Sequence, residues 1–132
     1  MSASLASWTF SPAAVSVHQA RNATRAQLAD WGLQHGCEFA ELLVSELVTN
    51  AIEHARGIVR LTLTAVGDRL RCEVEDCSPR LPRHRRALDD DEGSRGLHLV
   101  DALSSGWGST RTSSGKVVWF ELPVPAPAAA IA

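Results

Sequence analysis

The sequence predicts a two-layer α+β sandwich, in which about three helices cover one face of a mixed, mostly antiparallel sheet. The chain has 132 residues, which suits one compact domain. Strand-like segments occur in blocks separated by helical segments, the order typical of an α+β fold. Short turns join neighbouring strands, which favours antiparallel pairing. We expect the domain to span residues 1–123 and the Pro- and Ala-rich residues 124–132 to form a disordered tail.

The first half of the chain predicts one strand and two helices. A short strand is expected over residues 4–10. Ser11 is a suitable N-cap for a helix that runs to about Leu33, with Gly32 marking its end. A second helix is expected over residues 37–55, where Leu, Val and Ala recur at helical spacing.

The second half predicts two hairpins, separated by one long loop and one helix. The tight turn Gly67-Asp68 joins the strands of the first hairpin. The loop over residues 78–94 carries prolines and many charges, and it is either a solvated connection or a segment that closes over a ligand. The expected strands cover residues 58–66, 70–77, 106–110 and 116–122, and the helix covers residues 95–103.

Composition narrows the classes of function. The formal net charge of −2 argues against a dedicated nucleic-acid-binding protein, which normally carries a basic stripe. No apolar run approaches the roughly 20 residues that cross a bilayer, and the N-terminus lacks the features of a secretory signal. The three cysteines are odd in number and in no metal-binding spacing, which indicates reduced thiols. We therefore expect a cytoplasmic protein that contacts neither membrane nor nucleic acid directly.

The second helix carries polar side chains at the edge of its apolar face. Glu46, Asn50 and His54 are spaced four apart and therefore lie along one stripe. A half-buried Glu is costly unless it is paired, so these groups either satisfy one another or reach water at the rim. The other interpretation is a metal–nucleotide site. In that case Asn50 offers an oxygen to Mg²⁺, and Glu46 accepts a proton from an attacking hydroxyl.

A carboxylate stands near the end of the strand over residues 70–77. Alternation places Asp76 on the same face as Cys72 and Val74. If that face is the inner one, Asp76 is a buried acceptor suited to an exocyclic amine such as adenine N6. An Asp that caps the following turn is the alternative.

A glycine-rich segment opens the last helix. Residues 93–96 read Gly-Ser-Arg-Gly, and exposed backbone N–H groups at a helix start favour phosphate. Glycines near helix starts are common, so this pattern alone is weak evidence.

The polar stripe resembles a motif of a known superfamily. The run from Glu46 to Ala55, ELVTNAIEHA, resembles the N box of the Bergerat-fold ATPases, which include gyrase, sensor histidine kinases and anti-sigma serine kinases. The resemblance implies the Bergerat ATP-binding fold, in which Asn50 coordinates Mg²⁺ at the nucleotide phosphates. It also implies that Glu46 acts as the general base.

The segment after the 70–77 strand resembles the first glycine box of the same superfamily. The resemblance implies that Asp76 reads adenine. The usual glycines are absent, since Ser78 and Arg80 occupy their places. An Asp-x-Ser pattern with a nearby Pro resembles the anti-sigma branch, which fits this departure.

Residues 93–103 resemble the second glycine box, and Ser94 stands where a third glycine often lies. The closing segments, Trp107-Gly108 and 115–120, also resemble the anti-sigma branch. Many members of the superfamily have a Thr where Lys116 stands; that lysine either meets a phosphate or lies solvated in a turn. The resemblance implies that four residues of the second box bind the nucleotide: Gly93, Arg95, Gly96 and Leu97.

The resemblance as a whole implies a serine/threonine protein kinase of the anti-sigma factor type, with ATP and Mg²⁺ as cofactors. Such a protein binds a sigma factor, phosphorylates an anti-sigma antagonist on serine, and is compatible with a homodimer. A non-catalytic module that regulates by holding a protein partner is the alternative. A degenerate domain without nucleotide is a third interpretation.

Overall fold

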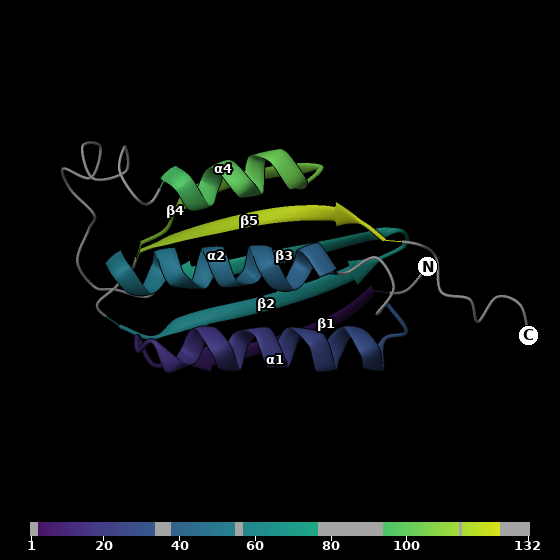
Figure 1. The fold of residues 1–132 in the computed structure, drawn as a ribbon, viewed down its shortest axis with the longest axis horizontal. Coiled ribbons are helices and arrows are strands. Elements are labelled where there is room, and N and C mark those ends of the chain that lie inside the picture. Colours follow the sequence, from purple (N-terminus) through teal and green to yellow (C-terminus); the bar gives the residue numbers. More distant parts are fainter. Residues whose placement is uncertain (1–2, 34–37, 55–56, 77–93, 114, 125–132) are drawn as a thin grey trace, which may run out of the picture.

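A computed structural model describes residues 3–33, 38–54, 57–76, 94–113 and 115–124. Figure 1 shows the order of the elements along the chain. The strands are β1 (Ala3–Phe10), β2 (Val59–Val66), β3 (Arg69–Asp76), β4 (Gly106–Arg111) and β5 (Lys116–Pro123). The helices are α1 (Val15–Asp30), α2 (Glu38–His54) and α4 (Ser94–Leu103).

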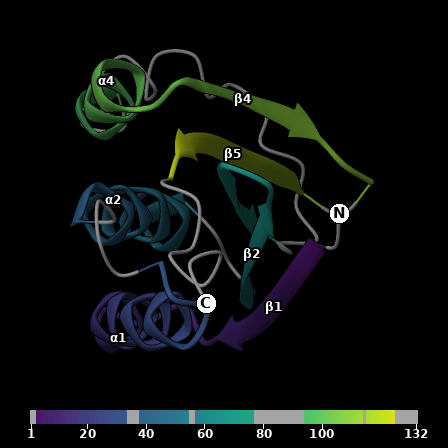
Figure 2. The ribbon, with the colours of Figure 1, turned by 90° about the vertical axis from the view of Figure 1, so that its right-hand side faces the viewer.

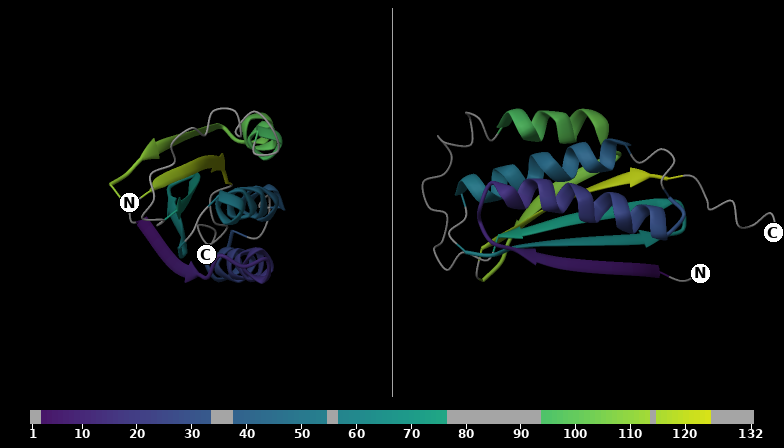
Figure 3. Two further views of the ribbon diagram at one scale, coloured as in Figure 1. Left: turned by 90° about the vertical axis from the view of Figure 1, so that its left-hand side faces the viewer. Right: turned by 60° about the horizontal axis from the view of Figure 1, so that its bottom comes forward.

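The described strands form one sheet in the order β1-β2-β3-β5-β4. All four pairings among the described strands are antiparallel. The sheet was expected to be mixed and mostly antiparallel, and no parallel pair occurs among these strands. The three helices lie side by side on one face of the sheet, and no described helix covers the other, which we call the open face (Figures 2 and 3). The predicted α+β sandwich is therefore confirmed.

The core lies between α2 and the central strands. Phe120 of β5 is fully buried, as are Leu61 and Leu63 of β2 and Leu70 of β3. The helix α2 contacts both α1 and α4 as well as β2 and β3, so it is the central helix of the layer. Burying apolar side chains on both layers stabilises the sandwich by about 1.5–3 kcal/mol for each large side chain.

The start of α1 differs from the prediction that Ser11 caps it. The helix begins at Val15, and no side chain caps its N-terminus. Instead the Ser16 hydroxyl, which is buried, donates a hydrogen bond to the carbonyl oxygen of Ser11 at 2.7 Å. Ser11 therefore contributes a backbone acceptor to the first turn rather than the side-chain cap that its residue type favours.

The end of α1 matches the prediction. Gly32 has a φ of 75°, which a residue without a Cβ adopts at no steric cost. The N–H of Leu33 donates to the carbonyl of Leu28 at 2.7 Å, and the N–H of Gly32 donates to Ala29 at 3.0 Å. These two bonds form a Schellman motif, and they direct the buried side chain of Leu33 into the core.

Strand β3 alternates strictly between the two faces of the sheet. Leu70, Cys72, Val74 and Asp76 are buried on the helix side, as the period of two requires. The turn that precedes this strand contains Gly67 at a φ of 60°, and Val66 pairs with Arg69 across it. The predicted tight turn is confirmed, and the face shared by Cys72, Val74 and Asp76, which the sequence left open, is the inner one.

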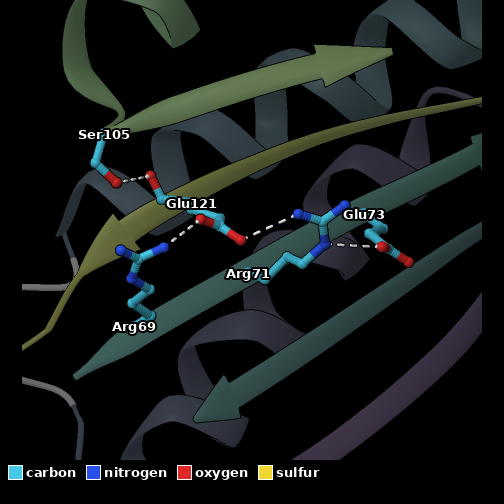
Figure 4. Close-up of polar contacts among 5 residues, drawn as sticks. All are labelled: Arg69, Arg71, Glu73, Ser105 and Glu121. Atoms are coloured by element: carbon cyan, nitrogen blue, oxygen red, sulfur yellow. Dashed lines mark hydrogen bonds and ion pairs between the residues drawn. The ribbon is translucent and has the colours of Figure 1, made fainter. Parts of the chain in front are cut away.

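The open face of the sheet carries paired charges. Figure 4 shows Glu121 between two arginines, with hydrogen bonds of 3.1 Å from Arg69 and 3.0 Å from Arg71. Arg71 also donates to Glu73 at 2.9 Å, and its guanidinium carbon lies 4.1 Å from the centroid of the Trp119 ring. Partial burial lowers the pKa of Arg71, but the hydrogen bonds to the two glutamates outweigh it and raise that pKa above its ordinary value.

Val124, the first residue of the predicted tail, is buried, and its N–H donates to the carbonyl of Asp68 at 2.8 Å. Residues 125–132 lie outside the described part of the chain. Among the described residues, no helix has both the length and the apolar character needed to span a membrane.

Candidate functional site

Helix α2 places its polar stripe at the border of its buried face. Glu46 and Asn50 are both half-buried, and Phe39 on the same stripe is exposed. His54 is the last residue of the helix, and its side chain lies outside the description. The buried face itself consists of Ala40, Leu43, Val44, Leu47, Val48 and Ala51.

Asp76 is a buried carboxylate at the end of a central strand. Its exposed fraction is 7%, and it is the last residue of β3. Its neighbours across the sheet are Val59 of β2 and Lys116 of β5. Burial of a carboxylate is costly unless polar partners compensate for it. Asp76 has polar interactions within the protein as well.

Several chain ends meet on one side of the molecule. In Figure 1 and in the right panel of Figure 3, α2 and β3 end where α4 and β5 begin. We call this side the site end. It brings the last turns of α2, which follow Asn50, to the same side as Asp76 and the first turn of α4. The elements therefore gather three segments that are far apart in the sequence, as the candidate site requires.

The second glycine box is only partly described. Helix α4 begins at Ser94, one residue before the predicted start. Arg95, Gly96 and Leu97 lie in its first turn, where backbone N–H groups have no partner inside the helix. The side chains of these residues, together with Gly93, Ser78 and Arg80, lie outside the described part of the chain.

Lys116 opens the last strand, as the predicted strand over residues 116–122 requires, and does not lie solvated in a turn. It is the first residue of β5, it is half-buried, and its Cα partner is Asp76. The loop before it is fixed by two hydrogen bonds, from the Thr112 N–H to the Gly115 carbonyl at 2.8 Å and from the Gly115 N–H to the Thr112 hydroxyl at 2.9 Å. The period of two over Lys116, Val118 and Phe120 is the sequence signal that assigns this lysine to the helix side.

The donor set suits a magnesium–nucleotide complex. Mg²⁺ takes few protein ligands and keeps water and phosphate oxygens, and the half-buried Asn50 offers one neutral oxygen. No three His, Cys, Asp or Glu side chains cluster as a metal site among the residues that the structure describes.

Cys72 and Asp101 are two further polar residues with local surroundings of their own. Cys72 is fully buried, and desolvation followed by the charge of Glu73 raises its pKa far above the ordinary value. This thiol stays protonated at neutral pH, which excludes it as a thiolate nucleophile. Asp101 accepts a hydrogen bond of 2.8 Å from the Trp107 indole N–H, a local contact between α4 and β4. Cys37 and Cys77 lie outside the described residues.

Known proteins share this fold and part of this sequence. The RsbU and RsbW domains of Rv1364c from Mycobacterium tuberculosis superpose with a TM-score of 0.67 and 20% identity, over 93% of this chain and 34% of that one. The histidine kinase domain of the blue-light-activated histidine kinase EL346 from Erythrobacter litoralis gives a TM-score of 0.51 and 32% identity, over 64% of this chain and 43% of that one.

A curated relative and a family model extend the comparison. Blue-light-activated histidine kinase 2 of Erythrobacter litoralis (strain HTCC2594) is 35% identical over an alignment of 96 residues, which covers 63% of this chain. This chain spans only 26% of the length of that relative. Residues 10–122 match the model of the histidine kinase-like ATPase domain, a range that runs from the last residue of β1 to the penultimate residue of β5. The chain therefore belongs to the histidine kinase-like ATPase domain family.

Proposed function

We propose that this chain is an ATP-binding serine/threonine protein kinase of the anti-sigma factor type. In this role it binds a sigma factor and phosphorylates an anti-sigma antagonist protein on serine. Membership of the histidine kinase-like ATPase family supports ATP as the nucleotide. The fold shared with the structure that contains an RsbW domain supports the anti-sigma branch at the level of architecture.

One observation carries the proposal. The half-buried Glu46 and Asn50 and the buried Asp76 come from two elements that end together at the site end, where α4 begins. Phosphoryl transfer depends on positioning and charge neutralisation more than on covalent chemistry by the protein. Such a transfer needs an acceptor that recognises the base, a neutral oxygen ligand for the cation and a carboxylate near it. Asp76, Asn50 and Glu46 are the residues that we propose for these tasks.

Each residue then has a defined role. Asp76 accepts a hydrogen bond from the adenine amine, and the first turn of α4, with Arg95, Gly96 and Leu97, binds the phosphates together with Gly93. Asn50 would hold Mg²⁺, which neutralises charge on the phosphates when it is bound. Glu46 accepts the proton of the serine hydroxyl of the partner protein as that oxygen attacks.

Calorimetric titration with ATP and Mg²⁺ tests the nucleotide site. The Asn50→Ala variant should lose Mg²⁺-dependent binding by about tenfold or more, because one charge-assisted contact is removed. Asn22→Ala, on the exposed face of α1, is the matched control and should bind as the unaltered chain does. Equal affinities for the Asn50 variant and the unaltered chain would remove Asn50 from the site.

Transfer of the γ-phosphate to a serine of an antagonist protein tests the catalytic role. Glu46→Gln should lower the rate by about 10²–10⁴-fold, the usual contribution of a general base, and should leave nucleotide affinity nearly unchanged. Glu53→Gln, an exposed change on the same helix, is the control for the loss of one charge. Tight ATP binding without any transfer would instead favour the non-catalytic binding module.

A further inference from the structure

A side-chain hydrogen bond joins α4 to the edge strand β4. The indole N–H of Trp107 donates to Oδ1 of Asp101 at 2.8 Å. Trp107 is half-buried, pairs across the strands with the fully buried Phe120, and packs against the core. The donor is therefore held in place by the sheet, whereas the acceptor lies on the exposed surface of α4.

Few of the described side chains of α4 fix its orientation. In the stretch from Leu99 to Leu103, Val100 alone is fully buried, Leu103 is partly buried against the core, and Leu99 is 37% exposed. A segment with few buried apolar contacts shifts at a small cost in free energy. The bond that Asp101 accepts from the sheet opposes a rotation of the helix about its own axis.

The orientation of α4 determines where the N–H groups of its first turn point. Those groups belong to Arg95, Gly96 and Leu97, and they are the proposed donors to the phosphates. Asp101 lies about 9 Å further along the same continuous helix, at a rise of 1.5 Å per residue. A rotation at Asp101 therefore reaches the first turn, where hydrogen bonds weaken steeply as their angles depart from linear.

We propose that Asp101 is a positioning residue for nucleotide binding. By accepting the hydrogen bond from Trp107, it sets the orientation of α4 and so directs the N–H groups of the first turn toward the phosphates. The proposal rests on the proposed nucleotide-binding function and adds a residue that acts through the helix. Asp76 belongs to the sheet, so recognition of the base does not depend on this bond.

Calorimetric titration of the full chain with ADP and Mg²⁺ tests the proposal. Asp101→Ala removes the acceptor, and the affinity for ADP should fall by about fivefold or more. Asp101→Asn keeps an oxygen acceptor at the same position and should bind ADP within about twofold of the unaltered chain. Asp30→Ala, at the exposed last residue of α1, removes the same charge elsewhere and is the matched control.

A second ligand and a second variant separate positioning from a general loss of structure. Adenosine carries the base without a phosphate, so Asp101→Ala should bind it as the unaltered chain does. Trp107→Phe keeps an aromatic ring and removes the donor, so it should weaken ADP as well. The double variant should lose no more ADP affinity than either single variant, because both changes remove the same bond.

The outcomes separate the two proposals. If Asp101→Ala binds ADP as tightly as the unaltered chain, the positioning role is overturned and the proposed nucleotide site stands. An equal loss of ADP and adenosine in Asp101→Ala would also overturn it, because the effect would then not pass through the phosphates. If the unaltered chain binds neither ligand, the proposed function fails and this inference fails with it.

Discussion

The two faces of the sheet differ in where they carry charged side chains and in how exposed those side chains are. On the open face, Arg71 lies against Trp119 and bonds to Glu73 and Glu121, so cations and anions neutralise each other within the sheet. On the helix side β2, β3 and β5 are apolar along most of their length, and Asp76 and Lys116 lie at strand ends. Asp76 lies on this side, and only 7% of it is exposed to solvent.

The charges on the two faces differ in how strongly water screens them. Ion pairs that are a third exposed contribute little to stability and tolerate change, since water and salt screen them. A buried carboxylate is costly without polar partners, which Asp76 has within the protein, and our proposal gives this carboxylate the further task of recognising the base. Strand β3 carries the partly exposed Glu73 on one face and the buried Asp76 on the other, so single substitutions can test the contrast.

The largest effect is expected on the helix side of β3. Asp76→Ala should weaken ATP binding by about 10- to 100-fold, because a charge-assisted hydrogen bond to the base contributes about 1.5–3 kcal/mol. Titration calorimetry measures the loss. Glu73→Ala, on the opposite face of the same strand, should leave the affinity unaltered. A similar loss of affinity in both variants would erase the distinction between the two faces.

An intermediate effect is expected from Gly108 of β4. A Cβ at this position would lie 2.9 Å from Cζ2 of the Trp119 ring, closer than side chains normally approach. Gly108→Ala should therefore lower the free energy of unfolding by about 1–2 kcal/mol, because the ring must shift from its place under Arg71. Denaturant unfolding gives the value. The neighbouring Gly106 has open space around it, so Gly106→Ala should cost less.

The smallest effect is expected from the ion pairs of the open face. Arg71→Gln should lower the free energy of unfolding by about 0.5–1 kcal/mol, because its side chain is 35% exposed and its pairs are screened. The difference from the unaltered chain should shrink in 1 M salt, where the Debye length is about 3 Å. A cost that stays constant with salt would assign the role of Arg71 to packing on Trp119 instead.

The order of the elements was predictable because periodicity distinguishes helices from strands. Alternation over residues 70–77 places Asp76 on one face with Cys72 and Val74, and the structure shows that this face is the inner one. The turn at Gly67 and the end of α1 at Gly32 follow from backbone conformations that glycine favours. The stripe of Glu46 and Asn50 follows from helical spacing alone.

The buried face of α1 was harder to predict, because two of its residues are polar. Ser16, Ala20, Thr24 and Leu28 are buried, whereas the apolar Val15 is 58% exposed. The Thr24 hydroxyl donates to the carbonyl of Ala20 at 2.8 Å and so satisfies itself within the helix. A count of apolar residues misses such positions, since a local hydrogen bond lowers the cost of burying a hydroxyl.

The environment of Lys116 depended on pairing across strands. Asp76 is far from Lys116 in the sequence, and only the register of β3 and β5 aligns the two residues. Arg111 faces Lys116 across the short hairpin of β4 and β5. The nucleotide roles of Gly93, Arg95, Gly96 and Leu97 remain predictions from the resemblance.

The corner between α4 and β4 has a mechanical consequence. Glu121 accepts hydrogen bonds at its backbone oxygen from both the N–H and the hydroxyl of Ser105, at 2.9 Å each, while Asp101 holds Trp107. These bonds fasten the C-terminal end of α4 to the sheet, at the side remote from the site end. A helix fixed at one end can reorient only by rotating about that end. Any movement of α4 would then be smallest near Ser105 and largest at the first turn of the helix, which lies at the site end.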